Sequence, residues 1–167
     1  MGVHDHHISA TWDDMLNVFE TIGEEGFDGD RKLLRGVDYR SSFEWEKIPA
    51  YYLSDYFIAR LNEDLPLSPE ERALYEFLKT YSVHLDWPRK PPSDLPVESS
   101  IVFRPERVKQ IAVSIVGLDL GKALEWYGSV WGDSFWTKDR VLAHLKKVVA
   151  FWADAAARGD ALLHTEF

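Results

Sequence analysis

The chain contains no cysteine, and acidic residues outnumber basic ones. The absence of Cys excludes disulfide bonds, thiolate zinc sites, iron–sulfur clusters and a cysteine nucleophile. It is compatible with a cytoplasmic protein, which is the location that we expect. With 19 Lys and Arg against 28 Asp and Glu, the formal net charge is −9. Because phosphate contacts require clustered Lys and Arg, we expect no binding to nucleic acid or to an anionic membrane. The charge favours a basic protein as partner.

The sequence also lacks the common motifs of serine hydrolases and of phosphate-binding proteins. It has no Gly-x-Ser-x-Gly elbow, no Gly-x-x-x-x-Gly-Lys loop and no Gly-x-Gly-x-x-Gly loop. The acidic pairs Asp13-Asp14 and Glu70-Glu71 begin predicted helices, where the helix dipole favours negative charge. The sequence therefore assigns no catalytic residue and no cofactor. No apolar stretch is long enough to span a bilayer, and the first residues are polar, unlike a signal peptide.

The composition is that of an ordinary globular protein. The apolar fraction is 46% and the charged fraction 28%, and 167 residues suffice for one domain with its own core. We predict a single α+β domain over residues 1–167, rich in helix, with a small sheet. The predicted strands are 3–9, 99–103 and 161–166. The predicted helices are 11–22, 49–62, 69–80, 105–116, 120–127 and 137–158.

The most informative segment is the last third of the chain. Five apolar residues recur there at helical spacing, and Gly159 follows the last of them as a predicted C-cap. The seven residues from Ala161 onward have the pattern of a strand. We predict that Trp152 is largely buried and that the final strand is paired in the sheet. The apolar stripe consists of Val141, Leu145, Val148, Trp152 and Ala155.

Four prolines between Trp87 and Pro96 predict a loop with polyproline character. A linker or a recognition tail would have the same composition. We interpret the segment as an ordered surface loop, because Trp87 and Leu95 would anchor it.

Two segments of the C-terminal half resemble a bacterial family. They are Val102-Phe103-Arg104-Pro105-Glu106-Arg107-Val108, a strand end that leads into a helix, and the run from Phe151 to Leu163. Together they are similar to the YfbM-like proteins, a family known only as a domain of unknown function. The resemblance covers about 99–167. It implies an α+β domain from a bacterium and implies no activity. The first half departs from the family: where members have Asp-Lys-x-Trp, this chain has Phe43-Glu44-Trp45-Glu46-Lys47.

One aromatic cluster is a candidate ligand site. From the end of the predicted helix 120–127 to the start of the next helix, four aromatic residues accompany one carboxylate, which would be the polar group of a ligand pocket. Packing of a loop between two helices is the alternative interpretation. The cluster consists of Trp126, Tyr127, Trp131, Asp133 and Trp136.

The histidines near the beginning of the chain are the candidate metal site. In a strand, His4 and His6 share one face, and Asp5 and His7 the other. Imidazole and carboxylate suit zinc, nickel or copper. The third ligand that we expect is His164, on the final strand. The alternative is a solvated terminus or the remainder of a tag.

Two functions remain open at this point. The absence of enzyme motifs, the acidity and the seven Trp residues favour a non-enzymatic protein-interaction domain, for example an immunity or antitoxin-like protein that blocks a basic toxin. The alternative is a small-molecule-binding protein or hydrolase that uses the aromatic cluster at 126–136.

Overall fold

The computed structural model confirms the helix-rich α+β class. It describes residues 4–22, 32, 35–63, 66–80, 91–97, 100–125, 127 and 137–166, of which 4–5, 45–52, 54 and 166 are described by their backbone alone. None of the helices in these ranges is both long and apolar enough to cross a membrane. The strands are β1 (His4–Ala10), β2 (Ser41–Glu46), β3 (Ser100–Phe103) and β4 (Ala161–Glu166). The helices are α1 (Trp12–Ile22), α3 (Lys47–Asn62), α4 (Pro69–Lys79), α5 (Pro105–Ile115), α6 (Leu120–Ala123) and α8 (Lys138–Arg158).

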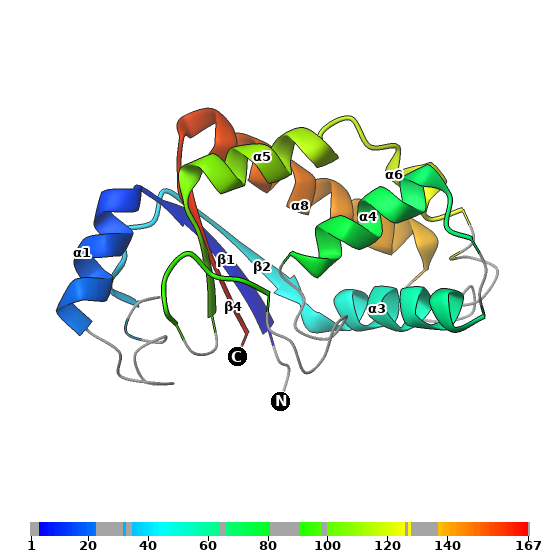
Figure 1. Ribbon diagram of the computed structural model, residues 1–167, viewed down its shortest axis with the longest axis horizontal. Helices are drawn as coiled ribbons and strands as arrows, with labels where there is room; N and C mark the ends of the chain where they lie inside the picture. The colour runs from blue at the N-terminus through cyan, green and yellow to red at the C-terminus, as the bar shows by residue number, and fades with distance from the viewer. Residues whose placement is uncertain are drawn as a thin grey trace.

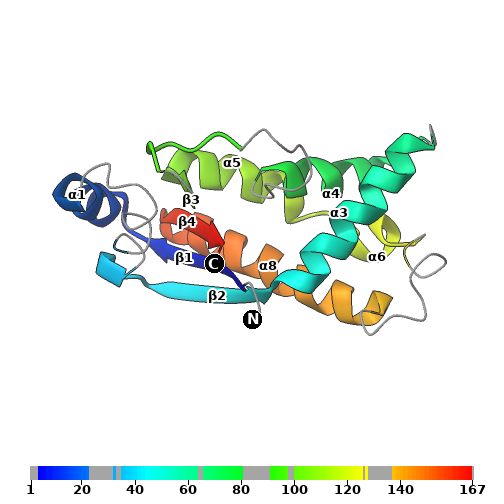
Figure 2. The same cartoon turned by 90° about the horizontal axis from the view of Figure 1, so that it is seen from below.

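The four strands form one antiparallel sheet in the order β2-β1-β4-β3. The first and the last strand of the chain are therefore neighbours at the centre of the sheet. In Figure 1, α1 lies at one end of the sheet and α3, α4 and α6 lie beyond the other end, and the view from below in Figure 2 shows the same separation.

Each face of the sheet packs against a different layer, because successive side chains of a strand alternate between faces. Ile101, Phe103 and Leu162 belong to the core that includes Trp152 of α8 and residues of α3, α4, α5 and α6. We call this side of the sheet face A. The opposite side, face B, carries Ile8, Ala10, Val102, Ala161 and Leu163, which pack with Met15 of α1 and with Leu95.

Trp152 is fully buried at the centre of the larger core, as the stripe on α8 predicts. Its ring meets Phe77 and Phe103 edge to face, with centroids 5.7 and 5.1 Å apart. This geometry is favourable for aromatic pairs and joins α4, α8 and β3.

Local signals fix most of the helix ends. Thr11 accepts a hydrogen bond from Asp14 N before α1, and Ser68 and Glu71 form a complete capping box at α4. Gly159 ends α8 in the left-handed region, at φ 71°. One helix start differs from the prediction: α3 begins at Lys47, two residues before Pro49. Proline is tolerated there because the first turn of a helix has no partner for its backbone N–H groups.

The described part of the proline-rich segment, 91–97, is an ordered loop beside β3. Leu95 is buried, as expected of an anchor, whereas Trp87 lies outside the described residues. The Asp94 backbone N–H donates to Val102 O at 2.8 Å, and Val102 N donates to Ser93 Oγ at 2.8 Å. The loop thus binds the outer edge of β3, an edge that would otherwise present unpaired backbone groups.

Candidate functional site

The aromatic cluster contributes to the core where it is described. Tyr127 is fully buried, and its ring lies 6.1 Å from that of Tyr56 in an edge-to-face arrangement. The other members, Trp126, Trp131, Asp133 and Trp136, lie outside the described residues, so the ligand pocket remains a prediction.

The histidines of β1 alternate between faces as the strand pattern predicts, but His164, the expected third ligand, does not lie on the expected face. His6 is half-buried on face B, and only the backbone of His4 is described. His164 is the direct partner of His7, so it lies on face A. The expectation that His164 joins His4 and His6 is therefore wrong, because neighbouring positions in register point to the same side of the sheet.

His7 and His164 instead form a buried pair inside the core. Each is 1% exposed, and the two ring centroids are 4.4 Å apart. His7 also meets Phe43 and Phe151 edge to face at 6.3 and 6.1 Å. Burial holds the pKa of His7 well below its ordinary value, and His164 and His6 lower it further. Its ring is therefore neutral at physiological pH.

Glu71, which is 1% exposed, is the centre of a second buried polar group. Its carboxylate accepts from Tyr56 Oη at 3.0 Å, from Arg60 Nη2 at 3.4 Å and from Ser68 N at 3.1 Å. Burial and the charge of Glu71 raise the pKa of the Tyr56 hydroxyl. These bonds tie α3 to the first turn of α4. The buried carboxylate of Glu71 therefore has a structural role.

A third network lies at the end of α8. The buried carboxylate of Asp160 binds Arg40 Nη1 at 2.9 Å and Arg158 Nε at 2.8 Å. Arg158 Nη2 also donates to Ser9 Oγ and Ser41 Oγ, which lie 2.6 Å from each other. Because these donors and acceptors bind one another, the network locks the end of α8 to β1 and β2.

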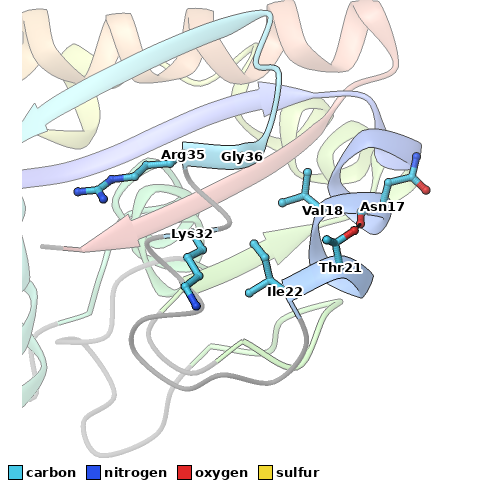
Figure 3. Close-up of a pocket in the computed structure, with 7 residues that line it drawn as sticks. All are labelled: Asn17, Val18, Thr21, Ile22, Lys32, Arg35 and Gly36. Atoms are coloured by element: carbon cyan, nitrogen blue, oxygen red, sulfur yellow. Dashed lines mark hydrogen bonds between the residues drawn. The ribbon is translucent and has the colours of Figure 1, made fainter.

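A hollow of about 520 Å³ lies between α1 and the segment around Lys32 and Gly36. Figure 3 shows Val18 and Ile22 on the α1 side, while the guanidinium of Arg35 extends away from α1. The charged group of Arg35 therefore does not approach the apolar wall of the hollow. Polar recognition of a small ligand requires convergent polar groups, so we do not assign a site to this hollow.

A groove lies between α5 and α8. It comprises two adjoining hollows of about 480 and 410 Å³ that share Val116. Val113 and Val116 are 74% and 59% exposed, among the few large apolar side chains that the described surface presents to solvent. The groove residues of α5 and its end are Lys109, Ala112, Val113, Val116 and Gly117, and those of α8 are Leu142, Lys146, Val149, Ala150, Ala153, Ala156 and Ala157.

These positions recur at i, i+3, i+4 and i+7 on both helices, so each helix presents a continuous stripe to the groove. The side chains of several α8 residues are small, which creates the depression between the two stripes. From Leu142 to Ala157 the stripe is about 22 Å long at the rise of an α-helix. That length matches a partner helix of about four turns.

The helices that form the groove are basic, although the chain as a whole is acidic. On α8, Lys138, Arg140, Lys146, Lys147 and Arg158 outnumber Asp139 and Asp154. Lys109 and Lys146 line the groove itself, and its one acidic lining residue is Asp119. The groove is therefore apolar along its floor and cationic along its rim.

Sequence reasoning missed this groove although part of its signal was present. Val116 lies within the helix predicted at 105–116, yet it follows the last turn of α5 and is exposed. Val113 is three residues earlier on the same exposed face, and an apolar residue exposed there is the signal that marks the groove.

Comparisons with known proteins give no identification. No family model, no curated protein and no solved structure matches this chain.

Proposed function

We propose that this protein is a non-enzymatic protein-interaction domain and that the α5–α8 groove is its docking surface. The exposure of Val113 and Val116 beside a floor of small residues carries the proposal. Contiguous apolar surface of this kind is costly in water unless a partner covers it. Grooves between two helices accept the apolar face of an amphipathic helix, with anchors at i, i+3, i+4 and i+7.

The chemistry of the rim favours an acidic helix as occupant. Lys109 and Lys146 lie on the two walls, and neither forms an ion pair with another described residue. Acidic side chains that flank the apolar face of a partner helix would meet these ammonium groups. Such pairs select the partner and speed its association more than they add affinity.

The basic partner expected from the net charge remains a separate prediction. It concerns the acidic remainder of the surface, because the helices around the groove are themselves cationic. An immunity or antitoxin-like role in the cytosol of a bacterium, and membership of the YfbM-like family, likewise stay proposals.

The test uses two labelled model peptides of about 16 residues with the same Leu/Ala face. One has Glu and the other has Lys on its polar face, and binding is followed by fluorescence anisotropy. We expect the Glu peptide to bind and the Lys peptide to bind at least about tenfold more weakly, a difference of about 1.4 kcal/mol. The variant Val113→Asp/Val116→Asp should lose binding, and Ser114→Asp on the same helix is the matched control.

Three results would overturn the proposal. Equal binding of the two peptides would remove the charge selectivity, and unchanged binding to the double variant would place the site elsewhere. Sedimentation that shows a stable dimer of the free chain, dissociated by the double variant, would make a second copy of the chain the occupant.

A further inference from the structure

We propose that the α5–α8 groove recognises its partner helix through two apolar anchors seven residues apart, one in each of its two hollows. The inference rests on the proposed function, because it takes an acidic amphipathic helix as the occupant of the groove. It adds the sequence pattern that such a helix must carry. We call the hollow of about 480 Å³ hollow 1 and the hollow of about 410 Å³ hollow 2.

Val116 divides the groove into two places for a side chain. It lines both hollows and is 59% exposed, and no other described residue lines both. An undivided groove accepts apolar side chains anywhere along its length. A groove divided by a protruding side chain accepts them only on either side of it, so the partner must straddle Val116.

The lining residues of α8 set an upper limit on the distance between the hollows. Those of hollow 1 lie within 142–150 and those of hollow 2 within 153–157. The midpoints of these ranges are about nine residues apart, which is about 13 Å at the rise of an α-helix. On the α5 side the two hollows meet at Val116, so their centres lie closer together than α8 alone indicates.

Only one spacing of anchors on a partner helix fits this distance. Residues four, seven and eleven apart share a face of a helix and lie about 6, 10.5 and 16.5 Å apart along its axis. Eleven residues exceed the limit. Four residues are too close, because an anchor on each side of Val116 needs about 4 Å of contact distance from it. Seven residues satisfy both conditions.

Both hollows suit apolar anchors, although their walls differ. Leu118 and Leu142 line hollow 1, whereas alanines of both helices line hollow 2. The one carboxylate of the groove, that of Asp119, lines hollow 1 and accepts a hydrogen bond from Lys122 N at 3.0 Å. This carboxylate caps α6, which accounts for its presence without a polar ligand.

The positive charges of the groove are also divided between the hollows. Lys146 lines hollow 1 from α8, and Lys109 lines hollow 2 from α5. Each hollow therefore combines an apolar floor with one ammonium group, on opposite walls of the groove. A partner helix that matches this arrangement has an acidic residue beside each anchor, on opposite flanks of its apolar face.

The first test varies the spacing of the anchors in the peptide. Three labelled Glu-bearing peptides of identical composition each have two Leu anchors on an Ala face, four, seven or eleven residues apart. Binding to the parent chain is followed by fluorescence anisotropy, and circular dichroism measures the helix content of each peptide. We expect the seven-residue spacing to bind at least about tenfold more tightly, because each other spacing leaves one Leu outside a hollow.

The second test fills one hollow at a time. Ala150→Leu adds a side chain to hollow 1 and Ala157→Leu adds one to hollow 2, and both alanines are exposed, which spares the core. Each variant should bind the seven-residue peptide about fivefold more weakly. Shortening one anchor of the peptide to Ala should cancel this loss in one variant, and shortening the other anchor should cancel it in the other variant. Ala59→Leu, on the exposed side of α3, is the matched control and should bind as the parent does.

Two results would overturn the two-anchor pattern and leave the docking site in place. They are equal binding of the three spacings to the parent chain, and coupling of both filled hollows to the same anchor. The first test needs no variant, so it decides the matter even if a variant does not fold. Failure of the parent chain to bind any of these peptides, or the Glu peptide of the preceding test, would instead refute the docking site itself.

Discussion

At the residue scale, the buried pair of His7 and His164 is the least expected feature of the core. Imidazole can be protonated near neutral pH, yet both rings are packed among aromatic side chains on face A. The neighbouring ring of His164 adds to the effect of burial in opposing the protonation of His7. Folding therefore favours the neutral form of His7, and the energetic consequence appears when the pH falls.

We predict that acid destabilises the protein through His7. In the unfolded chain its pKa returns to about 6.5, so below that pH the unfolded state binds a proton that the folded state does not. The stabilisation is complete above pH 6.5 and decreases as the pH falls, because the folded pKa is depressed. His7 alone should lower the free energy of unfolding by up to about 1.4 kcal/mol at pH 5.5 relative to pH 7.5.

Urea denaturation at both pH values, with EDTA present, measures this loss in the parent and in His7→Gln. The variant should lose less stability between the two pH values, whatever its stability at pH 7.5. His144→Gln, on α8, is the control for the general effect of removing a histidine. An identical pH-dependent loss in the parent and in His7→Gln would show that His7 does not account for the acid sensitivity.

Which residues are buried was largely predictable, but how they meet was not. The helical period placed Trp152 and its neighbours in the core, and the strand period correctly separated His6 from His7. Neither period states which residue of another strand lies opposite. The error over His164 has this cause, since register depends on contacts between distant segments.

At the element scale, α8 and the turn that follows it form the best-defined unit. Thr137 Oγ1 accepts from Arg140 N before the helix, and Gly159 ends it with φ 71°. From there the chain reverses into β4, and Arg158 and Asp160 fasten the turn to β1 and β2. The position of β4 therefore depends on one left-handed residue.

We predict that Gly159→Ala destabilises the protein by about 1–2 kcal/mol, the usual cost of a left-handed conformation for an L-residue. An added Cβ would meet no atom within 4 Å, so the loss would come from the backbone alone. Gly159→Asn should lose less, because Asn tolerates this region better.

The matched control for this prediction is Gly117→Ala. Its added Cβ also has open space, and Gly117 does not share the positive φ of Gly159. Chemical denaturation of the three variants decides the matter. Equal stability of Gly159→Ala and Gly117→Ala would mean that the turn adapts without strain.

Element starts were predictable where a side chain caps the helix, as Ser68 and Thr11 do. The start of α3 was not predictable. Pro49 is a strong local signal for a helix start, and the two residues before it carry no signal for an earlier one. The short strand β2 is absent from the predicted strands, since Ser41–Glu46 acquires its partner β1 from a distant part of the sequence.

At the scale of the whole molecule, the sheet determines stability because β4 is paired on both sides. It bonds to β1 and to β3, and it supplies Leu162 to the core on face A and Leu163 to the core on face B. The order of the strands could not be predicted, because strand patterns give the existence of a strand and not its neighbours.

We predict that deletion of 161–167 abolishes cooperative folding rather than lowering stability by a fixed increment. The deletion removes the hydrogen bonds that β4 makes with β1 and with β3, and it opens the cores on both faces of the sheet. Near-ultraviolet circular dichroism and thermal unfolding report the loss of fixed packing. A truncated chain that still unfolds in one sharp transition near the parent's midpoint would contradict the central role of β4.

The central pairing of β1 with β4 joins segments more than 150 residues apart, which has a consequence for synthesis. The ribosome produces β1 long before β4. Until residue 166 has been made, β1 has only β2 beside it, and its other edge presents unpaired backbone groups to the cell. Closing so long a loop is also slow. The nascent chain is therefore at risk of aggregation for as long as β4 has not been made, and a holdase chaperone that shields the open edge of β1 would raise the yield of native protein.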